Sequence, residues 1–200
     1  EDIDPVRFIG NRSSGKMGFA LAEEAVSQGA HVILVAGPVY LPTPIGVKRI
    51  DVRSAQQMHE AVMANVGACN VFIAAAAVAD YRPAQKCPQK IKKSESAITL
   101  ELERTADILS DVAALSNRPD CVVGFAAETE RVDEYALGKL NKKNLDLIAA
   151  NDVSNAAIGF ESENNALTVY SRTERIDIAQ GSKRQVAHAL LAIIQKFLKE

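Results

Sequence analysis

The stretch Gly10-Asn11-Arg12-Ser13-Ser14-Gly15-Lys16-Met17-Gly18 nearly matches a mononucleotide-binding phosphate loop and departs from it at one position. In that pattern, G-x-x-x-x-G-K, the next residue is a Ser or Thr whose hydroxyl binds magnesium. Here that residue is Met17, and a thioether is a poor ligand for a hard cation. Two hydroxyls, two glycines and a lysine at a helix start still predict an anion site, held by a different geometry.

The residues that follow predict a helix and then a buried strand. Apolar residues recur at spacings of three and four across residues 16–28, and Gly29 supplies a stop. The run His31–Ala36 is apolar and β-branched, as in a strand covered on both faces. Loop, helix and strand predict part of a βαβ unit. Only residues 6–9 are available for the strand before the loop, so we expect the first strand of the fold to be missing.

The rest of the chain alternates between the two element types. Strands are predicted at 48–52, 70–78, 98–102, 121–126 and 145–150, and helices at 54–66, 106–115 and 132–143. A hairpin over 166–178, either an edge element or an oligomer contact, precedes a closing helix capped by Ser182. The order predicts one domain over residues 1–200, an α/β Rossmann-like three-layer sandwich with a mainly parallel sheet and a C-terminal β-hairpin.

Composition excludes several classes of protein. The 200 residues are 48% hydrophobic and 24% charged, with a net charge of −2, which suits one globular domain and argues against duplex nucleic acid as the main partner. No apolar run of membrane-spanning length occurs, so we expect no membrane partner. Cys69, Cys87 and Cys121 fit neither a disulfide framework nor a zinc site, which favours a reducing, cytoplasmic location.

Four segments should meet at one edge of the sheet, because each follows a predicted parallel strand. They are residues 11–16, 74–80, 124–129 and 150–152. Alanines at 74–77 and 126–127 would let a flat ligand such as a base lie against the backbone. Such alanines equally well leave room for packed helices, and spacing alone does not separate the two interpretations.

Lysines are the other candidate ligand-binding groups. Lys90-Ile91-Lys92-Lys93 lies in a long polar segment, residues 80–96, which is either a binding loop over phosphates or a solvated face. Lys139 and Lys143 share one helix face and could meet the same anion. Exposed lysines without a ligand remain the alternative for each.

Taken together, the motifs resemble the bacterial phosphopantothenoylcysteine synthetase, the C-terminal half of a bifunctional coenzyme A biosynthesis protein. They run in order along almost the whole chain: Asp4-Pro5-Val6-Arg7, Asn11 to Gly18, Ala76-Ala77-Val78-Ala79-Asp80-Tyr81, Lys90 to Lys93, Gly124 to Thr129, Lys143-Asn144-x-Asp146 and Ala150-Asn151-Asp152. Each is weak alone, and their combination is specific.

The resemblance implies a CTP-dependent ligase that joins 4′-phosphopantothenate to L-cysteine. In such enzymes the carboxylate attacks CTP to give an acyl-cytidylate and pyrophosphate, and the cysteine amine then displaces CMP. Magnesium is implied, held largely by phosphate oxygens and water, and no residue is singled out as its ligand. The resemblance also implies a homodimer and a fused or associated decarboxylase domain, which alone would hold FMN.

By carry-over, Asn11 and Lys90 are the catalytic candidates, with Asn11 donating to the anhydride carbonyl and Lys90 leading a flap. The nucleotide-binding candidates are Ser13, Ser14, Gly15, Lys16, Ala76, Ala77, Asp80, Lys90, Ala106, Asp107, Ile108, Phe125, Lys139 and Lys143. Phe125 should lie by the base and ribose. The chain departs from the family pattern in lacking the glycine-rich strand before Asp4 and in carrying Ala106 where a proline is expected.

Two other functions are compatible with parts of the sequence. A dinucleotide-dependent oxidoreductase shares the fold, but it should show G-x-G-x-x-G and an acid after its second strand, where this chain has Ala36-Gly37-Pro38. A non-catalytic nucleotide-binding module would explain the loops but not Asn11 together with a lysine flap. CTP rather than ATP follows from the resemblance and from no single residue.

Overall fold

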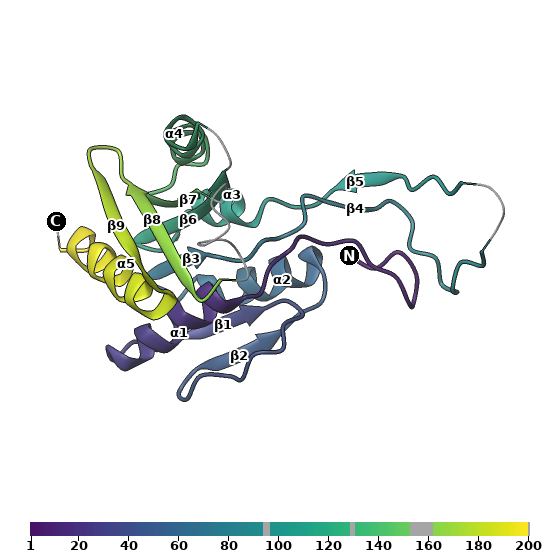
Figure 1. The fold of residues 1–200 in the computed structure, drawn as a ribbon, viewed down its shortest axis with the longest axis horizontal. Helices are drawn as coiled ribbons and strands as arrows, with labels where there is room; N and C mark the ends of the chain where they lie inside the picture. Colours follow the sequence, from purple (N-terminus) through teal and green to yellow (C-terminus); the bar gives the residue numbers. More distant parts are fainter. Residues whose placement is uncertain (94–96, 129–130, 153–161, 200) are drawn as a thin grey trace.

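The computed structural model describes residues 1–93, 97–128, 131–152 and 162–199. Its main sheet has the strand order β3-β6-β7-β8-β9, with bounds Val71–Ala74, Cys121–Glu128, Leu147–Asp152, Asn164–Tyr170 and Arg175–Ser182 (Figure 1). β3, β6 and β7 run parallel. β8 and β9 continue the sheet as an antiparallel hairpin. The predicted C-terminal hairpin is therefore an edge element of the main sheet.

Helices cover both faces of this sheet, because successive residues of the central strands point to opposite sides. Val122 and Ile148 pack in one cluster with α2 (Ala55–Val66), α3 (Ile108–Ala113) and α4 (Val132–Lys142). Val123 and Leu147 pack in a second cluster with α1 (Lys16–Ser27) and α5 (Lys183–Phe197). The predicted three-layer α/β class is confirmed.

A separate parallel pair, β1 (Ile33–Ala36) and β2 (Lys48–Asp51), lies beside α2. Among the described residues β1 pairs only with β2, and β3 only with β6. In a Rossmann-like order the first strand lies between these two edges. The expectation of a further strand is not tested by these pairings.

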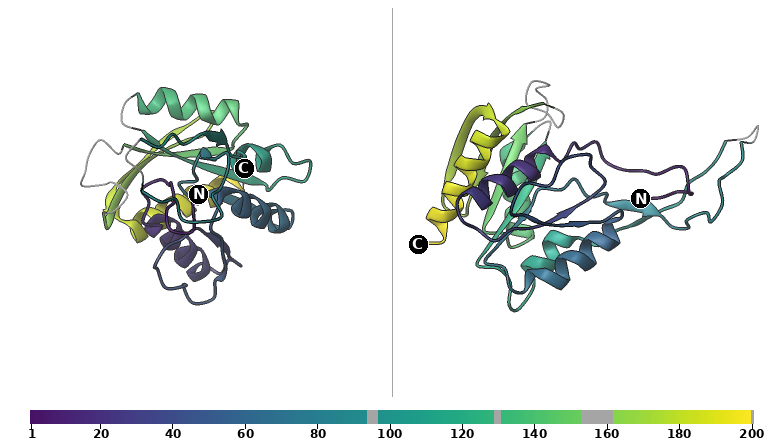
Figure 2. Two further views of the ribbon diagram at one scale, coloured as in Figure 1. Left: turned by 90° about the vertical axis from the view of Figure 1, so that its right-hand side faces the viewer. Right: turned by 90° about the horizontal axis from the view of Figure 1, so that it is seen from below.

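The segment between β3 and α3 leaves the body as a long arm (Figures 1 and 2). Within it, β4 (Tyr81–Pro83) pairs antiparallel with β5 (Leu102–Arg104). The prediction of a strand over 98–102 was wrong, since only Leu102 belongs to β5. Apolar residues alternate at Ile98, Leu100 and Leu102, but all three side chains are exposed. The alternation here therefore does not mark a strand that covers a core.

Other boundaries follow local signals. Ser54 caps α2 and Ser182 caps α5 with a full capping box, as predicted. The strand predicted over 70–78 ends at Ala74, and the carbonyls of residues 77–80 beyond it accept hydrogen bonds from Asn11 and Thr105. The helix predicted over 106–115 is shorter, with Asp107 as its N-cap. Over the described ranges, no helix combines the length and apolarity needed to cross a bilayer.

Candidate functional site

The loop before α1 has the geometry of an anion site. Gly15 adopts a left-handed conformation, with φ 74°, and no side chain caps the helix. A Cβ atom there would lie 2.9 Å from Val39 Cγ1, so the position requires glycine. Ser13 Oγ accepts from the Gly15 N–H at 3.4 Å, and Ser14 Oγ from the Lys16 N–H at 3.5 Å. Hydroxyls and backbone N–H groups thus gather at the positive end of the helix.

Asn11 joins this loop to the end of β3. Its amide nitrogen donates to the carbonyl oxygens of Val78 at 2.9 Å and Ala77 at 3.4 Å. Two carbonyl acceptors fix which end of the amide is nitrogen. The amide nitrogen of Asn11, which the resemblance expects to donate to an anhydride, donates to the backbone in this conformation. The amide oxygen of Asn11 points away from the two carbonyls.

A second connection joins the end of β3 to the start of α3. The Thr105 hydroxyl donates to the Ala79 carbonyl at 2.6 Å, and the Thr105 N–H donates to the Asp80 carbonyl at 3.0 Å. Ala106, Asp107 and Ile108 follow directly in the sequence. The structure therefore brings together three segments that the sequence separates: the Asn11 loop, residues 76–80 and residues 106–108.

Asp107 and Lys143 form the charged end of this arrangement. Asp107 accepts from the Ser110 N–H at 3.1 Å as the cap of α3, and Lys143 Nζ lies 2.8 Å from its other oxygen. Burial opposes ionisation of Asp107, but the bonds from Lys143 and Ser110 outweigh it and lower its pKa. Lys139 lies one turn earlier, where its carbonyl accepts from the Lys143 N–H.

Lys16 has a partner that sequence reasoning did not find. Its ammonium pairs with Glu163, and this hydrogen bond lowers the pKa of Glu163. Beside them Lys183 is buried, donates to the carbonyls of Ser162 and Asn164, and has a pKa lowered by burial and then by Lys16. No local pattern marks a pair that lies 147 residues apart in the chain.

The remaining candidates lie to either side of this cluster. Phe125 of β6 packs with Met17 and Ala75 against the cluster of α1 and α5, and Asn165 Nδ2 lies 3.6 Å from the Met17 sulfur. Met17 is thus a packing residue. Lys90 lies on the arm, and it shares no hydrogen bond or ion pair with the other candidates in the described part of the chain. Thr129 of the 124–129 motif falls outside the described residues.

A metal held by protein ligands requires several ligating side chains close together. Across residues 1–93, 97–128, 131–152 and 162–199, no three His, Cys, Asp or Glu side chains gather as a metal site would require. Asp107 is committed to Lys143 and to its helix cap.

The structure is that of an α/β domain with a glycine- and serine-containing loop at the N-terminus of α1. The sequence profile of one family, the DNA/pantothenate metabolism flavoprotein C-terminal domain, matches residues 1–198. The chain belongs to this family.

Relatives with assigned names support the same placement. Coenzyme A biosynthesis bifunctional proteins CoaBC from Vibrio cholerae and Bacillus subtilis are 52% and 44% identical over 98% and 100% of this chain. The protein of that name from Escherichia coli is 54% identical over 85% of this chain. The chain spans about half the length of these relatives, 50%, 50% and 43% respectively.

Solved structures agree with the fold. The crystal structure of the C-terminal domain of a CoaBC bifunctional protein matches with a TM-score of 0.83 and 43% identity, over all of this chain and 90% of that one. A Cab2 H337A mutant in complex with phosphopantothenate-cysteine matches with a TM-score of 0.76 over 99% of this chain and 84% of that one. At 16% identity that second likeness concerns the fold alone.

Proposed function

We propose that this chain is a ligase domain of coenzyme A biosynthesis that joins 4′-phosphopantothenate to L-cysteine with CTP. One observation carries the proposal most directly: Asn11 is bonded to the carbonyls of Ala77 and Val78, so the anion loop and the alanine-rich end of β3 form one site. The relatives named as coenzyme A biosynthesis proteins support the pathway.

The proposed reaction has two steps. The substrate carboxylate attacks the α-phosphorus of CTP, which forms a mixed anhydride and releases pyrophosphate. The cysteine amine then attacks the anhydride carbonyl, forms the amide and releases CMP, while the amine loses a proton. Because oxide is a very poor leaving group, the first step is what makes the carboxylate reactive toward an amine. Such chemistry depends on positioning and on cations near phosphate charge.

Different residues of the site would contact different parts of the nucleotide. The loop Ser13–Lys16 offers hydroxyls and N–H groups to phosphate, and residues 76–80 with 106–108 offer a surface of small side chains for the nucleotide. Lys143 and Lys16 hold carboxylate partners, Asp107 and Glu163. A triphosphate would compete with those carboxylates for the two ammonium groups. A magnesium ion, when bound, would add charge neutralisation to the phosphates.

Asn11 carries a more specific role. Since its nitrogen faces two carbonyls, its oxygen is the better placed end to accept from the attacking amine and orient its lone pair toward the anhydride. The alternative is the expected role, in which Asn11 donates to the anhydride carbonyl. Both roles require the amide group, because a carboxylate has no N–H to donate either to the two carbonyls or to the anhydride.

The first test is pyrophosphate release by the natural full-length protein with 4′-phosphopantothenate, magnesium and either CTP or ATP. We expect release with CTP and a CMP-linked intermediate that cysteine discharges. N11D should retain nucleotide binding but lose discharge by roughly a hundredfold or more. N65D is the matched control, because Asn65 also donates to a backbone carbonyl, that of Ala61, but outside the site. CTP binding without pyrophosphate release would instead indicate a non-catalytic module.

A homodimer is part of this proposal. The hairpin β8–β9 is a weaker candidate for the interface than the arm, because β8 is largely buried within the main sheet. The arm exposes four large apolar side chains: Tyr81, Ile98, Leu100 and Leu102. We expect L100K to shift the sedimentation coefficient toward that of a monomer, whereas I176K on β9 should leave it unchanged. A monomeric wild-type protein would contradict the proposal.

A further inference from the structure

A short N-terminal turn lies against the arm and holds one of its segments. The Cys87 N–H donates to the Ile3 carbonyl at 2.9 Å, and the Ile91 N–H donates to Asp4 Oδ2 at 3.2 Å. Arg7 Nη1 returns a bond to the Ile91 carbonyl at 3.2 Å. The turn, residues 3–7, therefore fixes the arm at two points, Cys87 and Ile91, and Ile91 directly follows Lys90 in the sequence.

Asp4 is the centre of this contact, and its side chain is fully buried. Its Oδ1 accepts from the Val6 and Arg7 N–H groups at 2.7 and 2.8 Å, which closes the turn. Its Oδ2 accepts from Arg7 Nη1 at 2.7 Å and from Ile91. A buried charge is tolerated only with such a set of donors. Burial would raise the pKa of Asp4, but the N–H donors of Val6, Arg7 and Ile91 lower it to about 2.

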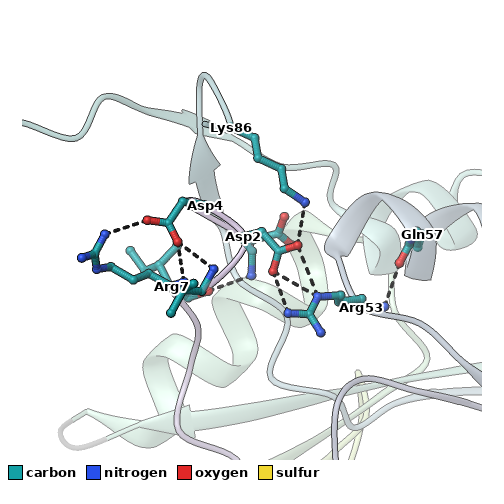
Figure 3. A network of polar contacts seen from close by, with 9 residues as sticks. Asp2, Asp4, Arg7, Arg53, Gln57 and Lys86 are labelled. Atoms are coloured by element: carbon teal, nitrogen blue, oxygen red, sulfur yellow. Dashed lines mark hydrogen bonds and ion pairs between the residues drawn. The ribbon is translucent and has the colours of Figure 1, made fainter. Parts of the chain in front are cut away.

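The two oxygens therefore serve different structures: Oδ1 serves the turn, and Oδ2 reaches the arm. Asp2 makes a separate connection, through Lys86 at 2.7 Å and Arg53 at 3.0 Å, that joins the turn to the arm and to the start of α2. Figure 3 shows the two carboxylates side by side with separate partners. A substitution that removes the acceptor Oδ2 of Asp4 therefore leaves the contacts of Asp2 with Lys86 and Arg53 in place.

We propose that Asp4 is a positioning residue for Lys90: it holds the Ile91 N–H and so fixes the base of the lysine segment, residues 90–93. The three ammonium groups of this segment are exposed. A segment fixed at its base presents them to a phosphate at a smaller entropic cost than a free one. This inference rests on the proposed function, in which Lys90 meets the nucleotide.

The first experiment tests the anchor without any assay of activity. In D4N the amide oxygen can still accept from the Val6 and Arg7 N–H groups. The amide NH₂ group takes the place of Oδ2, and because it is a donor it cannot accept from the Ile91 N–H or from Arg7 Nη1. We expect trypsin to cleave after Lys90, Lys92 and Lys93 roughly tenfold faster in D4N than in the wild type, because a charge-assisted bond is lost. D2N is the matched control and should change these cleavages less than D4N does. Equal rates in D4N and wild type would overturn the proposal.

A measurement on the unaltered protein covers the case in which D4N does not fold. Hydrogen exchange at the Ile91 amide should be slower, by roughly tenfold or more, than at the amides of Lys92 and Lys93. Exchange at the same rate at all three amides would show that Asp4 does not hold the segment, and would also overturn the proposal.

The second experiment asks whether Asp4 acts through Lys90, again in the natural full-length protein. D4N should lower kcat/KM for CTP by roughly tenfold, and D4N in the K90Q background should lower it no further. Losses that multiply in the double variant would assign Asp4 a general structural role and overturn the proposal. If the wild type releases no pyrophosphate, the proposed function fails, whereas the trypsin and exchange results still decide whether Asp4 anchors the segment.

Discussion

In the main sheet, the valine, leucine and isoleucine side chains of β6 and β7 are buried on both faces, whereas in the arm Tyr81, Ile98, Leu100 and Leu102 remain exposed. The arm is held instead by a few directed contacts, from Asp2, Asp4 and Arg7. Burial scales with area and hydrogen bonds depend on direction. The body should therefore respond to changes of volume, and the arm to changes of charge and donors.

The largest effect should come from removing volume in the body. Leu140 of α4 is fully buried in the cluster with α2 and α3, and L140A should lower the free energy of unfolding by about 3 kcal/mol. L102A on the arm is the matched control, since that side chain is 40% exposed, and should cost less than about 1 kcal/mol. Urea denaturation measures both. Equal losses would remove the distinction between body and arm.

Adding volume should cost somewhat less. A Cβ atom at Gly124 would lie 2.8 Å from Leu145 Cδ1 and 3.0 Å from Leu109 Cδ2, so G124A should destabilise by about 2 kcal/mol. Gly138 on α4 has nothing within 4 Å of such an atom, and G138A should stabilise by about 0.5 kcal/mol through helix propensity. Thermal denaturation should show shifts of opposite sign. A stabilised G124A would mean that the leucines repack freely.

A polar contact inside the body sharpens the comparison through its pH dependence. Glu24 of α1 is buried against α5, where bonds from His188 first and Gln28 next lower its pKa from 4.5 to about 2. Because the pKa is lowered by folding, this stabilisation is complete above about pH 4.5 and is lost as the pH falls toward 2. E24Q should therefore be less stable than the wild type at pH 7 and equal to it near pH 2.

The matched control for that experiment is E23Q, since Glu23 is exposed on the same helix. It should track the wild type at every pH in urea titrations. A constant difference between E24Q and wild type from pH 7 to pH 2 would contradict the assignment of the pKa shift to the folded-state contacts.

The smallest effect should come from a surface charge of the arm. The ammonium of Lys86 is 2.7 Å from Asp2, but the side chain is 58% exposed, so K86M should change the free energy of unfolding by less than about 0.5 kcal/mol. Salt should abolish even that difference. A loss as large as that of L140A would show that the arm and the body unfold as one packed unit.

Prediction from sequence succeeded where a residue's neighbours along the chain decide its structure. The apolar periodicity of residues 183–197, the run Cys121–Ala126 and the cap at Ser54 are local signals, and each element formed as predicted. The alternation of apolar residues at 98–102 is also a local signal, but it occurs both in buried strands and in this exposed arm. The two cases differ in whether another layer of the protein covers the segment, and that depends on residues far away in the chain.

The site divides in the same way. The loop at Asn11 to Gly15 precedes a helix, as the sequence predicts, whereas Asp107, predicted inside a helix over 106–115, is the N-cap of α3. The pairing of Lys16 with Glu163 and of Asp4 with Ile91 depends on how distant segments meet. The direction of the Asn11 amide also depends on carbonyls 66 and 67 residues away. Such contacts need the tertiary structure.

The packing of α1 against α5 has a consequence for how the chain is made. Leu21 of α1 shares a core cluster with Leu190 of α5, and Glu24 pairs with His188 of that same helix, the last one described. Ribosomes add roughly 5–20 residues per second, so α1 waits on the order of ten seconds for residues 183–197 to be synthesised. During that interval the part of α1 that α5 will cover is open to other nascent chains and to chaperones, and a message truncated before α5 would release a product in which that part stays uncovered.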